Sequence, residues 1–441
     1  MRRQLPLLVE EATDISTEAR SRFSDVRARI EFLMANDLDF RGADTGYATH
    51  HLHSFAARFP PQLPRYFIEA LTDPEEIVLD PMVGSGTTVV EAALLGRKGI
   101  GIDLDPLAIL ISKAKTTPVA FEALLEAGKR VLTCTHRLLK DGLNIGDVLS
   151  PDPATEDFVQ YWFLPRTQQE LTALVQAIRE ESSPSIRRFL LVILSSIIVT
   201  KSGGVSLARD LAHSRPHRDM DKSVPSALEL FQTRFRRARP DNSLPVGSSI
   251  IIHGDAQHLP LPTESVHLVV TSPPYANAID YMRAHKFSLV WMGKSIQELS
   301  QWRSRHIGSE KIHPIEMENL PSLAQNVVRE LSTQDSRKAR VLARYFAEMT
   351  NVLREVWRVL RPGAAAIFVV GTSTIRGINV QTHLCLTEIA THVGFEMVRI
   401  AERRLDRDRR MMPARQGGNR STIEQRMHHE YVISLIKPES R

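Results

Sequence analysis

The sequence has few of the features that mark disulfide-rich or metal-binding proteins. Its 441 residues include only two cysteines, Cys134 and Cys385, far apart and outside any CxxC or Cys/His spacing. This spacing argues against a disulfide framework and a zinc site. The histidines at 50, 51 and 53 have no matching ligands beside them, so no metal is expected. A reducing compartment fits this cysteine usage best.

Long hydrophobic runs are also lacking. The longest, FLLVILSSIIV at 189–199, is well short of the roughly 20 residues that span a bilayer, and it is typical of a buried helix. The N-terminal MRRQLPLLVEEATD reaches acidic residues before any long apolar core, so no signal peptide is expected. We therefore predict a cytoplasmic protein without membrane association.

The overall composition is that of an ordinary globular protein. Hydrophobic residues make up 42% and charged residues 24% of the chain, and this balance is typical of enzymes. Lys and Arg outnumber Asp and Glu by 56 to 51. This slight excess of positive charge favours an anionic partner but does not identify one.

Short apolar runs that end at Gly, Asp or Pro alternate with helical patterns such as 87–96 and 340–360. Continuous apolar strands separated by helices indicate an α/β fold, in which helices cover both faces of a mostly parallel sheet. Two late strands, 395–401 and 430–437, are expected to pair as an antiparallel hairpin and to complete a sheet of about seven strands. The five earlier runs are 76–80, 99–103, 249–253, 266–270 and 364–370.

Helical patterns outside this alternation suggest extensions and insertions. A surface helix is expected over 14–36, which begins with Asp and Ser and has apolar residues at helical spacing. We predict an N-terminal helical extension over 1–45 and a core domain formed by 46–110 together with 249–441. A helical insertion over 111–248 could recognise a target, and a smaller insertion within the core domain covers 294–340.

A glycine-rich turn follows the first predicted strand. Residues 80–88 read DPMVGSGTT, and glycines at 84 and 86 allow a ligand to approach the backbone where a helix begins. The turn lacks the third glycine of the dinucleotide fingerprint and the GK[ST] of the P-loop, so NAD and ATP are disfavoured. A tight structural turn remains the alternative.

Acidic residues follow the next two strands. Asp103 lies 17 residues beyond Gly86 at a strand end, where a carboxylate can accept both ribose hydroxyls of an adenosine-bearing ligand. Asp105 fits better as the cap of the helix that begins near Pro106. Asp255 could bind an adenine amino group or could be a plain turn residue.

The fourth strand runs directly into TSPPY at 271–275. Two prolines after Ser272 force a stiff extended loop at the strand end. Asp280 and Tyr281 lie just beyond and could line the same pocket; for Asp280 the start of a helix is an equal alternative. Because the carboxyl ends of parallel strands meet at one crevice, Gly84, Asp103, Asp255 and Ser272 are expected to converge there.

These two motifs resemble those of the S-adenosylmethionine-dependent DNA amino-methyltransferases. DPMVGSGTT is similar to their cofactor motif DPFxGSGTT, and TSPPY is similar to their catalytic motif [DNS]PP[YFW]. The resemblance implies a Rossmann-like class I methyltransferase fold and S-adenosyl-L-methionine as cofactor. It implies cofactor contacts from Asp80, Pro81, Met82, Gly84, Ser85, Gly86, Thr87, Thr88, Asp103, Asp255 and, in the segment before the first strand, Phe59.

In the catalytic loop the resemblance implies roles for Ser272, Pro273, Pro274 and Tyr275. The chemistry supports this on its own, because an exocyclic amine is a poor nucleophile until hydrogen bonds from it to Ser272 Oγ and the Pro273 carbonyl free its lone pair. The aligned amine can then attack an activated methyl group. Tyr275 is expected to stack on a base flipped out of the duplex, and its ring could also face a sulfonium cation.

Two departures from the family pattern matter. Met82 replaces the usual phenylalanine, which keeps the position apolar. Serine at 272 is most typical of cytosine-N4 enzymes, but those commonly carry the catalytic motif before the cofactor motif, and here the order is reversed. Cytosine N4 is therefore preferred as the target, and adenine N6 remains open.

Clusters of arginine suggest contacts with the DNA backbone. The richest, 402–426, lies between the last two predicted strands, and Trp302 with Arg303 interleaves an aromatic ring with a cation. The expected partner is double-stranded DNA, and a cognate restriction endonuclease is a further candidate. The predicted DNA-binding residues are Arg403, Arg404, Arg409, Arg410, Arg415, Arg420, Trp302 and Arg303.

Two further functions stay open at this point. An RNA methyltransferase that acts on the exocyclic amine of guanine would use a similar Pro-Pro-Tyr loop, commonly with Asn or Asp in place of Ser272. A catalytically silent DNA-binding subunit would keep the fold for recognition alone. The intact glycine turn, Asp103 and SPPY argue against a silent subunit, because such a subunit has no physical need for all of them.

Overall fold

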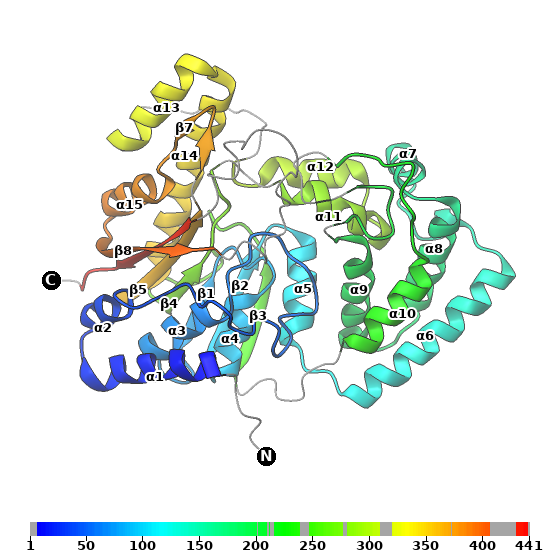
Figure 1. The fold of residues 1–441 in the computed structure, drawn as a ribbon, viewed down its shortest axis with the longest axis horizontal. Helices are drawn as coiled ribbons and strands as arrows, with labels where there is room; N and C mark the ends of the chain where they lie inside the picture. Colours follow the sequence, from blue (N-terminus) through cyan, green and yellow to red (C-terminus); the bar gives the residue numbers. More distant parts are fainter. Residues whose placement is uncertain are drawn as a thin grey trace.

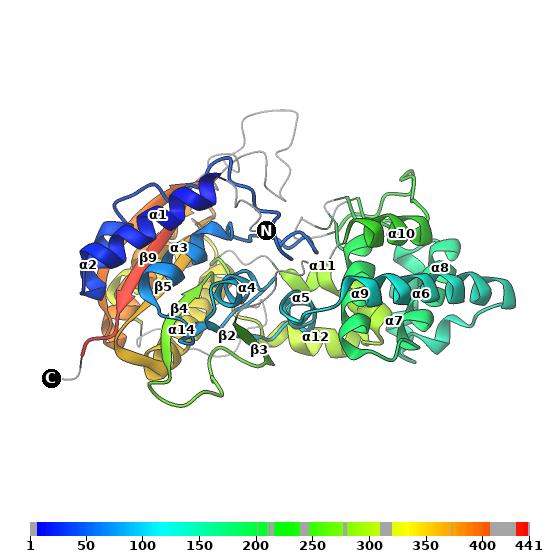
Figure 2. The ribbon, with the colours of Figure 1, turned by 90° about the horizontal axis from the view of Figure 1, so that it is seen from below.

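The computed structural model describes residues 7–200, 202–209, 211, 216–238, 247–276, 280–308, 320–371, 373–405 and 429–439. A sheet covered by helices forms one part of the molecule, and a group of helices lies beside it (Figures 1 and 2). Within the described ranges no helix is both long enough and apolar enough to cross a bilayer.

Seven strands of the described chain form the main sheet, in the order β3-β2-β1-β4-β5-β9-β8. The first five are parallel, and β9 pairs antiparallel with both β5 and β8. This confirms the predicted fold with its C-terminal hairpin. The strands are β1 Ile77–Asp80, β2 Lys98–Asp103, β3 Ser248–His253, β4 Val266–Thr271, β5 Leu360–Gly371, β8 Glu396–Arg404 and β9 His429–Ile436; a separate ribbon pairs β6 Thr374–Ile375 with β7 Ile378–Asn379.

The central strands are apolar on both faces, as a covered parallel sheet requires. Val78, Leu268 and Val270 pack against the N-terminal helices, and their neighbours Leu79 and Val269 pack on the opposite face. The N-terminal helices are α1 Leu7–Arg22, α2 Val26–Leu33 and α3 Gln62–Leu71; those on the opposite face are α13 Ser322–Gln334, α14 Ser336–Val359 and α15 Thr382–Val393.

Helices α4 Thr87–Leu94 and α5 Pro106–Thr116 follow β1 and β2 and pack beside them. From α5 a second hydrophobic core extends into the helical group on the right of Figure 1. The helices of this group are α6 Phe121–Asp141, α7 Pro153–Trp162, α8 Pro165–Arg179, α9 Pro184–Ile198 and α10 Ala227–Arg237, joined by α11 Tyr281–Leu289 and α12 Ile296–Arg305. The domain boundaries given from the sequence remain a prediction.

The N-terminal segment differs from the expected single helix over 14–36. Helix α1 ends at Arg22 and α2 begins at Val26, with the Asp25 side chain accepting a hydrogen bond from the backbone N–H of Ala28. Aspartate in this position ends one helical pattern and starts another, because it satisfies backbone donors that a continuous helix would pair internally.

The hairpin of β8 and β9 corrects one predicted DNA contact. Arg403, near the end of β8, is buried, donates to the Glu430 carboxylate at 2.7 Å, and donates from Nε to the Leu38 carbonyl. Arg403 and Glu430 are cross-strand partners in the hairpin register. A guanidinium that is buried and paired in this way is not available to a DNA phosphate, so Arg403 stabilises the fold instead. Arg404, the next residue, is exposed.

We predict that Arg403→Met lowers the free energy of unfolding by about 3 to 5 kcal/mol, because it leaves the Glu430 carboxylate buried without its cation. The matched control Arg404→Met should change it by less than about 0.5 kcal/mol, as at most surface positions. Urea denaturation followed by circular dichroism measures both values. Equal effects of the two substitutions would contradict the structural role of Arg403.

Candidate functional site

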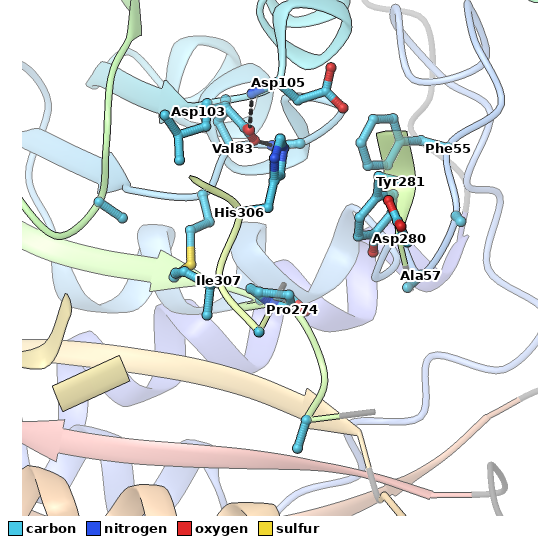
Figure 3. A pocket seen from close by; sticks show the side chains of 18 of the residues that line it. Phe55, Ala57, Val83, Asp103, Asp105, Pro274, Asp280, Tyr281, His306 and Ile307 are labelled. Carbon is cyan, nitrogen blue, oxygen red and sulfur yellow. Dashed lines mark hydrogen bonds between the residues drawn. The ribbon is translucent and has the colours of Figure 1, made fainter. Parts of the chain in front are cut away.

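A cavity of about 640 Å³ opens at the carboxyl ends of the central parallel strands. The strand order reverses between β1 and β4, and ligands of open α/β sheets bind at such a reversal. Gly84, Asp103, Asp255 and Ser272 all line this one cavity, as the strand-end argument predicts. Figure 3 shows the cavity with side chains from several strand ends, from the start of α11 and from the segment that follows α12.

The glycine turn between β1 and α4 needs its two glycines. Gly84 and Gly86 have φ values of +47° and +82°, a region that side-chain-bearing residues rarely adopt. A Cβ at Gly86 would lie 3.0 Å from Ser112 Oγ, so this glycine lets α4 and α5 approach each other. A Cβ at Gly84 would lie 3.2 Å from the ring of Phe55, which covers the turn beside the cavity.

Asp80 joins the glycine turn to the SPPY loop. The Thr271 hydroxyl donates to Asp80 Oδ1 at 2.7 Å, and Thr271 directly precedes Ser272. The Thr88 hydroxyl adds a second link by donating to the carbonyl of Val270 at 3.1 Å. Burial raises the pKa of Asp80 to about 6, although the hydroxyl donors oppose this shift.

Asp103 and Asp105 both line the cavity, and they differ in the hydrogen bonds that they accept. Asp103 lines the cavity, and its carboxylate accepts from the backbone N–H groups of Gly84 and Asp105, each at 2.9 Å. Asp105 caps α5 by accepting from Leu107 N–H, which confirms the predicted cap. Burial raises the pKa of Asp103. Burial also acts to raise the pKa of Asp105, but contact with the His285 imidazole lowers it to about 2.

The aromatic wall of the cavity comes from Phe55 and Tyr281. Their rings are stacked, with centroids 5.4 Å apart and planes inclined by 24°, and both residues line the cavity. Figure 3 shows the two side chains next to each other at the edge of the site. Tyr281 was noted in the sequence as a neighbour of the catalytic loop; the part played by Phe55 was missed.

Tyr275 does not line the cavity, so it is not in the position expected of a residue that stacks on a flipped base. Its ring packs against Gly371 of β5, where only glycine leaves room for it. Its hydroxyl donates to Glu430 Oε1 at 2.6 Å, and the side chain is buried. A buried phenol needs a hydrogen-bond partner, and Glu430 at the start of β9 provides one behind the cavity wall.

The other predicted residues divide between the cavity and its surroundings. Pro273, Gly86, Thr88 and Trp302 lie outside the lining, and the exposed Arg404 also lies outside it. Arg409, Arg410, Arg415 and Arg420 fall outside the described residues. Those predicted residues that line the cavity besides the four already named are Asp80, Pro81, Met82, Ser85, Thr87, Phe59, Pro274 and Arg303.

Ion pairs between arginines and aspartates line the cavity near the SPPY loop. Asp280 Oδ2 accepts from Arg303 at 2.5 Å and from Arg283 at 2.8 Å, and all three residues line the cavity. Arg376 also lines it and pairs with Asp335. The predicted role of Arg303 in DNA contact therefore competes with an ion pair that ties α12 to the catalytic loop.

Several cavity residues were not predicted from the sequence, although some of them lie in the segment before the first strand that contains the predicted Phe59. They come from the segment before α3, from the end of α12, from the start of α14 and from the β6–β7 ribbon, which only tertiary folding brings together. They include Ala56, Ala57, Arg58, His306, Ile307, Lys338, Val341, Thr374 and Ile375. Among the described residues, no group of three or more His, Cys, Asp or Glu side chains could hold a metal ion.

The cavity fits S-adenosylmethionine. Its size lies in the range of small-molecule sites, and carboxylates of Asp80, Asp103 and Asp255 on its wall complement a ligand with a sulfonium and an ammonium group. Asp103 accepts one backbone N–H at each oxygen, and each carboxylate oxygen has a further lone pair for a ribose hydroxyl. The ring of Phe55 beside the bare Cα of Gly84 offers an aromatic surface to a sulfonium cation.

Comparisons with known proteins agree with this chemistry. Residues 37–114, from before α3 through most of α5, match the model of the DNA methylase family of N6 and N4 methyltransferases. The type II methyltransferase M.MvaI of Kocuria varians is 25% identical over 385 residues, or 80% of this chain and 83% of that protein. The type II methyltransferase M.BsoBI of Geobacillus stearothermophilus is 23% identical over 419 residues, or 81% of each chain.

The sheet order, with the cavity at its reversal point, is that of the class I methyltransferase fold. Within that fold, residues 37–114 match the DNA methylase family of N6 and N4 methyltransferases, and type II methyltransferases align with about 80% of the chain. These similarities support the S-adenosylmethionine-dependent DNA amino-methyltransferase family. The matched range 37–114 contains the glycine turn and Asp103 but ends before the SPPY loop.

The raised pKa of Asp80 predicts a pH-dependent stability. Because the folded protein holds the protonated acid up to about pH 6 and the unfolded chain only to about pH 3.8, the free energy of unfolding should fall as the pH rises between these values. In Asp80→Asn, which keeps the oxygen that accepts from Thr271, this component disappears. Between pH 4.5 and 7.5 the variant should gain about 2 kcal/mol relative to the unaltered protein. Urea denaturation at both pH values measures the difference; a pH-independent difference would contradict it.

Proposed function

We propose that this protein transfers the methyl group of S-adenosylmethionine to the exocyclic N4 amine of a cytosine flipped out of duplex DNA. The observation that carries the proposal is that Ser272 of the SPPY loop and Gly84 of the cofactor turn line the same cavity. A methyl donor at the glycine turn and an amine at Ser272 would thus share one enclosed space. The serine at 272 favours cytosine N4, through the resemblance described above.

The catalytic loop suits an amine nucleophile. S-adenosylmethionine supplies an activated methyl group when it is bound. Ser272 Oγ and the Pro273 carbonyl can accept hydrogen bonds from the amine N–H groups, which draws electron density to the nitrogen and directs its lone pair. The prolines at 273 and 274 hold these acceptors still, so alignment does not depend on ordering a mobile loop. Pro274 and Tyr281 give the apolar surface against which a flipped base can lie.

The charges at the cavity support a nucleic-acid substrate. Arg283, Arg303 and Arg376 line the cavity, and each is held by a carboxylate. A phosphate that replaces Asp280 or Asp335 as the partner would be bound by an arginine already oriented at the cavity. The relatives named above are called type II methyltransferases; on that basis we include protection of DNA from a cognate endonuclease in the proposal.

Adenine N6 is the second candidate target. The family model that matches this chain covers both N6 and N4 enzymes, and an adenine amine could use the same acceptors at Ser272 and Pro273. RNA is less well supported as a substrate, because the matched family is one of DNA methylases.

Ser272 gives a direct test of the catalytic loop. We expect Ser272→Ala to lower kcat roughly 100-fold, the scale for losing one preorganised polar contact to the reacting group, and to leave the Kd for S-adenosylhomocysteine unchanged within about twofold. Single-turnover methyl transfer and calorimetry measure the two quantities. The exposed residue Ser182 gives the control variant, Ser182→Ala, which should behave like the unaltered protein. Normal turnover in Ser272→Ala would refute the role of the hydroxyl.

The identity of the methylated base is settled by mass spectrometry of nucleosides from duplex DNA incubated with the protein and S-adenosylmethionine. We expect N4-methylcytosine and no N6-methyladenine. N6-methyladenine as the product would replace the proposal by its second candidate. Methylation of RNA but not of DNA in the same assay would contradict both.

A further inference from the structure

His306, which directly follows α12, has one ring nitrogen whose role is fixed by the backbone. Nδ1 lies 2.9 Å from the carbonyl oxygen of Trp302. A carbonyl oxygen can only accept, so Nδ1 carries the hydrogen and donates it. In the neutral imidazole, Nε2 is then a hydrogen-bond acceptor. The turn at the end of α12 thus sets both the tautomer and the direction of the ring.

The other nitrogen has no hydrogen-bond partner among the described residues. Nε2 is buried and makes no hydrogen bond to any described residue, although His306 lines the cavity. Figure 3 shows its imidazole pointing toward the hydrogen-bonded carboxylate of Asp103. Burying an unsatisfied polar atom is costly. An acceptor oriented by the backbone and left without a donor at a ligand cavity indicates a place for a donor from the ligand.

Asp103 and His306 line the same part of the cavity but belong to different segments of the chain. Asp103 is at the end of β2, whereas His306 follows α12, and both line the cavity. Figure 3 shows the two side chains near each other. No hydrogen bond between the two side chains is present, so a donor group of the ligand can stand between them.

We propose that His306 is a second ligand of the cofactor's ribose, with Nε2 accepting a hydrogen bond from one hydroxyl of the diol while Asp103 accepts from the other. A diol offers two adjacent donors to two facing acceptors. His306 lies outside the residues that match the family model, 37–114. The inference rests on the binding of S-adenosylmethionine but not on which base is methylated.

The contribution of His306 can be measured by binding alone. Calorimetry would compare S-adenosylhomocysteine with its 2′-deoxy and 3′-deoxy analogues, for the full-length protein and for His306→Ala. We expect His306→Ala to bind S-adenosylhomocysteine about three- to tenfold more weakly, the effect of one neutral hydrogen bond. The unaltered protein should lose a similar factor with one of the two deoxy analogues. His306→Ala should lose nothing further with that analogue, because the contact is already absent.

Control variants separate this contact from a general loss of structure. His136, exposed on α6, gives His136→Ala, which should bind all three ligands as the unaltered protein does. If His306→Ala does not fold, His306→Phe keeps a ring of similar size without the nitrogen and should give the same result. Unchanged affinity in the folded variant, or equal losses with both deoxy analogues in the variant and the unaltered protein, would overturn the proposal. Neither outcome depends on the base specificity, which the nucleoside analysis tests separately.

Discussion

The hydrogen bond from the Thr271 hydroxyl to the Asp80 carboxylate holds together the two halves of the site. Asp80 ends β1 and is followed by the glycine turn, and Thr271 ends β4 and is followed by Ser272. The separation of the cofactor turn from the catalytic loop is therefore fixed by two neighbouring strands and by one buried bond between their ends. Direct transfer of a methyl group requires the two reactants in line. This bond helps to fix the separation of the two loops that would hold those reactants.

Burial of carboxylates at these strand ends disfavours their ionised forms. Asp80 and Asp103 both have raised pKa values because they are buried, and each also feels a neighbouring aspartate. A cation in the cavity would favour their ionised forms and offset part of this cost. Binding of a sulfonium ligand is thus coupled to the ionisation of the groups that hold the glycine turn. Burial of these carboxylates costs stability in the free protein, and the same burial favours the binding of a positively charged ligand.

Local signals in the sequence were enough to predict the sheet, the glycine turn and the meeting of the strand ends. Each of these depends on short patterns, such as an apolar run ending at Asp80 or two prolines after Ser272. The burial of Arg403 was not predictable in this way, because it depends on the register that sets it opposite Glu430 across the hairpin. His306 was missed because no motif includes it, and only packing brings it to the cavity. Phe55 lies in the same segment as the predicted Phe59 but was not singled out.

The position of Tyr275 connects the catalytic loop to the hairpin. Glu430 accepts from the Tyr275 hydroxyl at one oxygen and from Arg403 at the other, so a single buried carboxylate links the loop to the ends of β8 and β9. In the sequence, the arginine-rich segment lies between these two strand ends. Tyr275, Glu430 and Arg403 therefore connect the proline-stiffened SPPY loop to these two strand ends. None of the three side chains lines the cavity. A tyrosine in this motif can thus serve the site by anchoring the loop from behind, while the stacked pair of Phe55 and Tyr281 forms the aromatic wall.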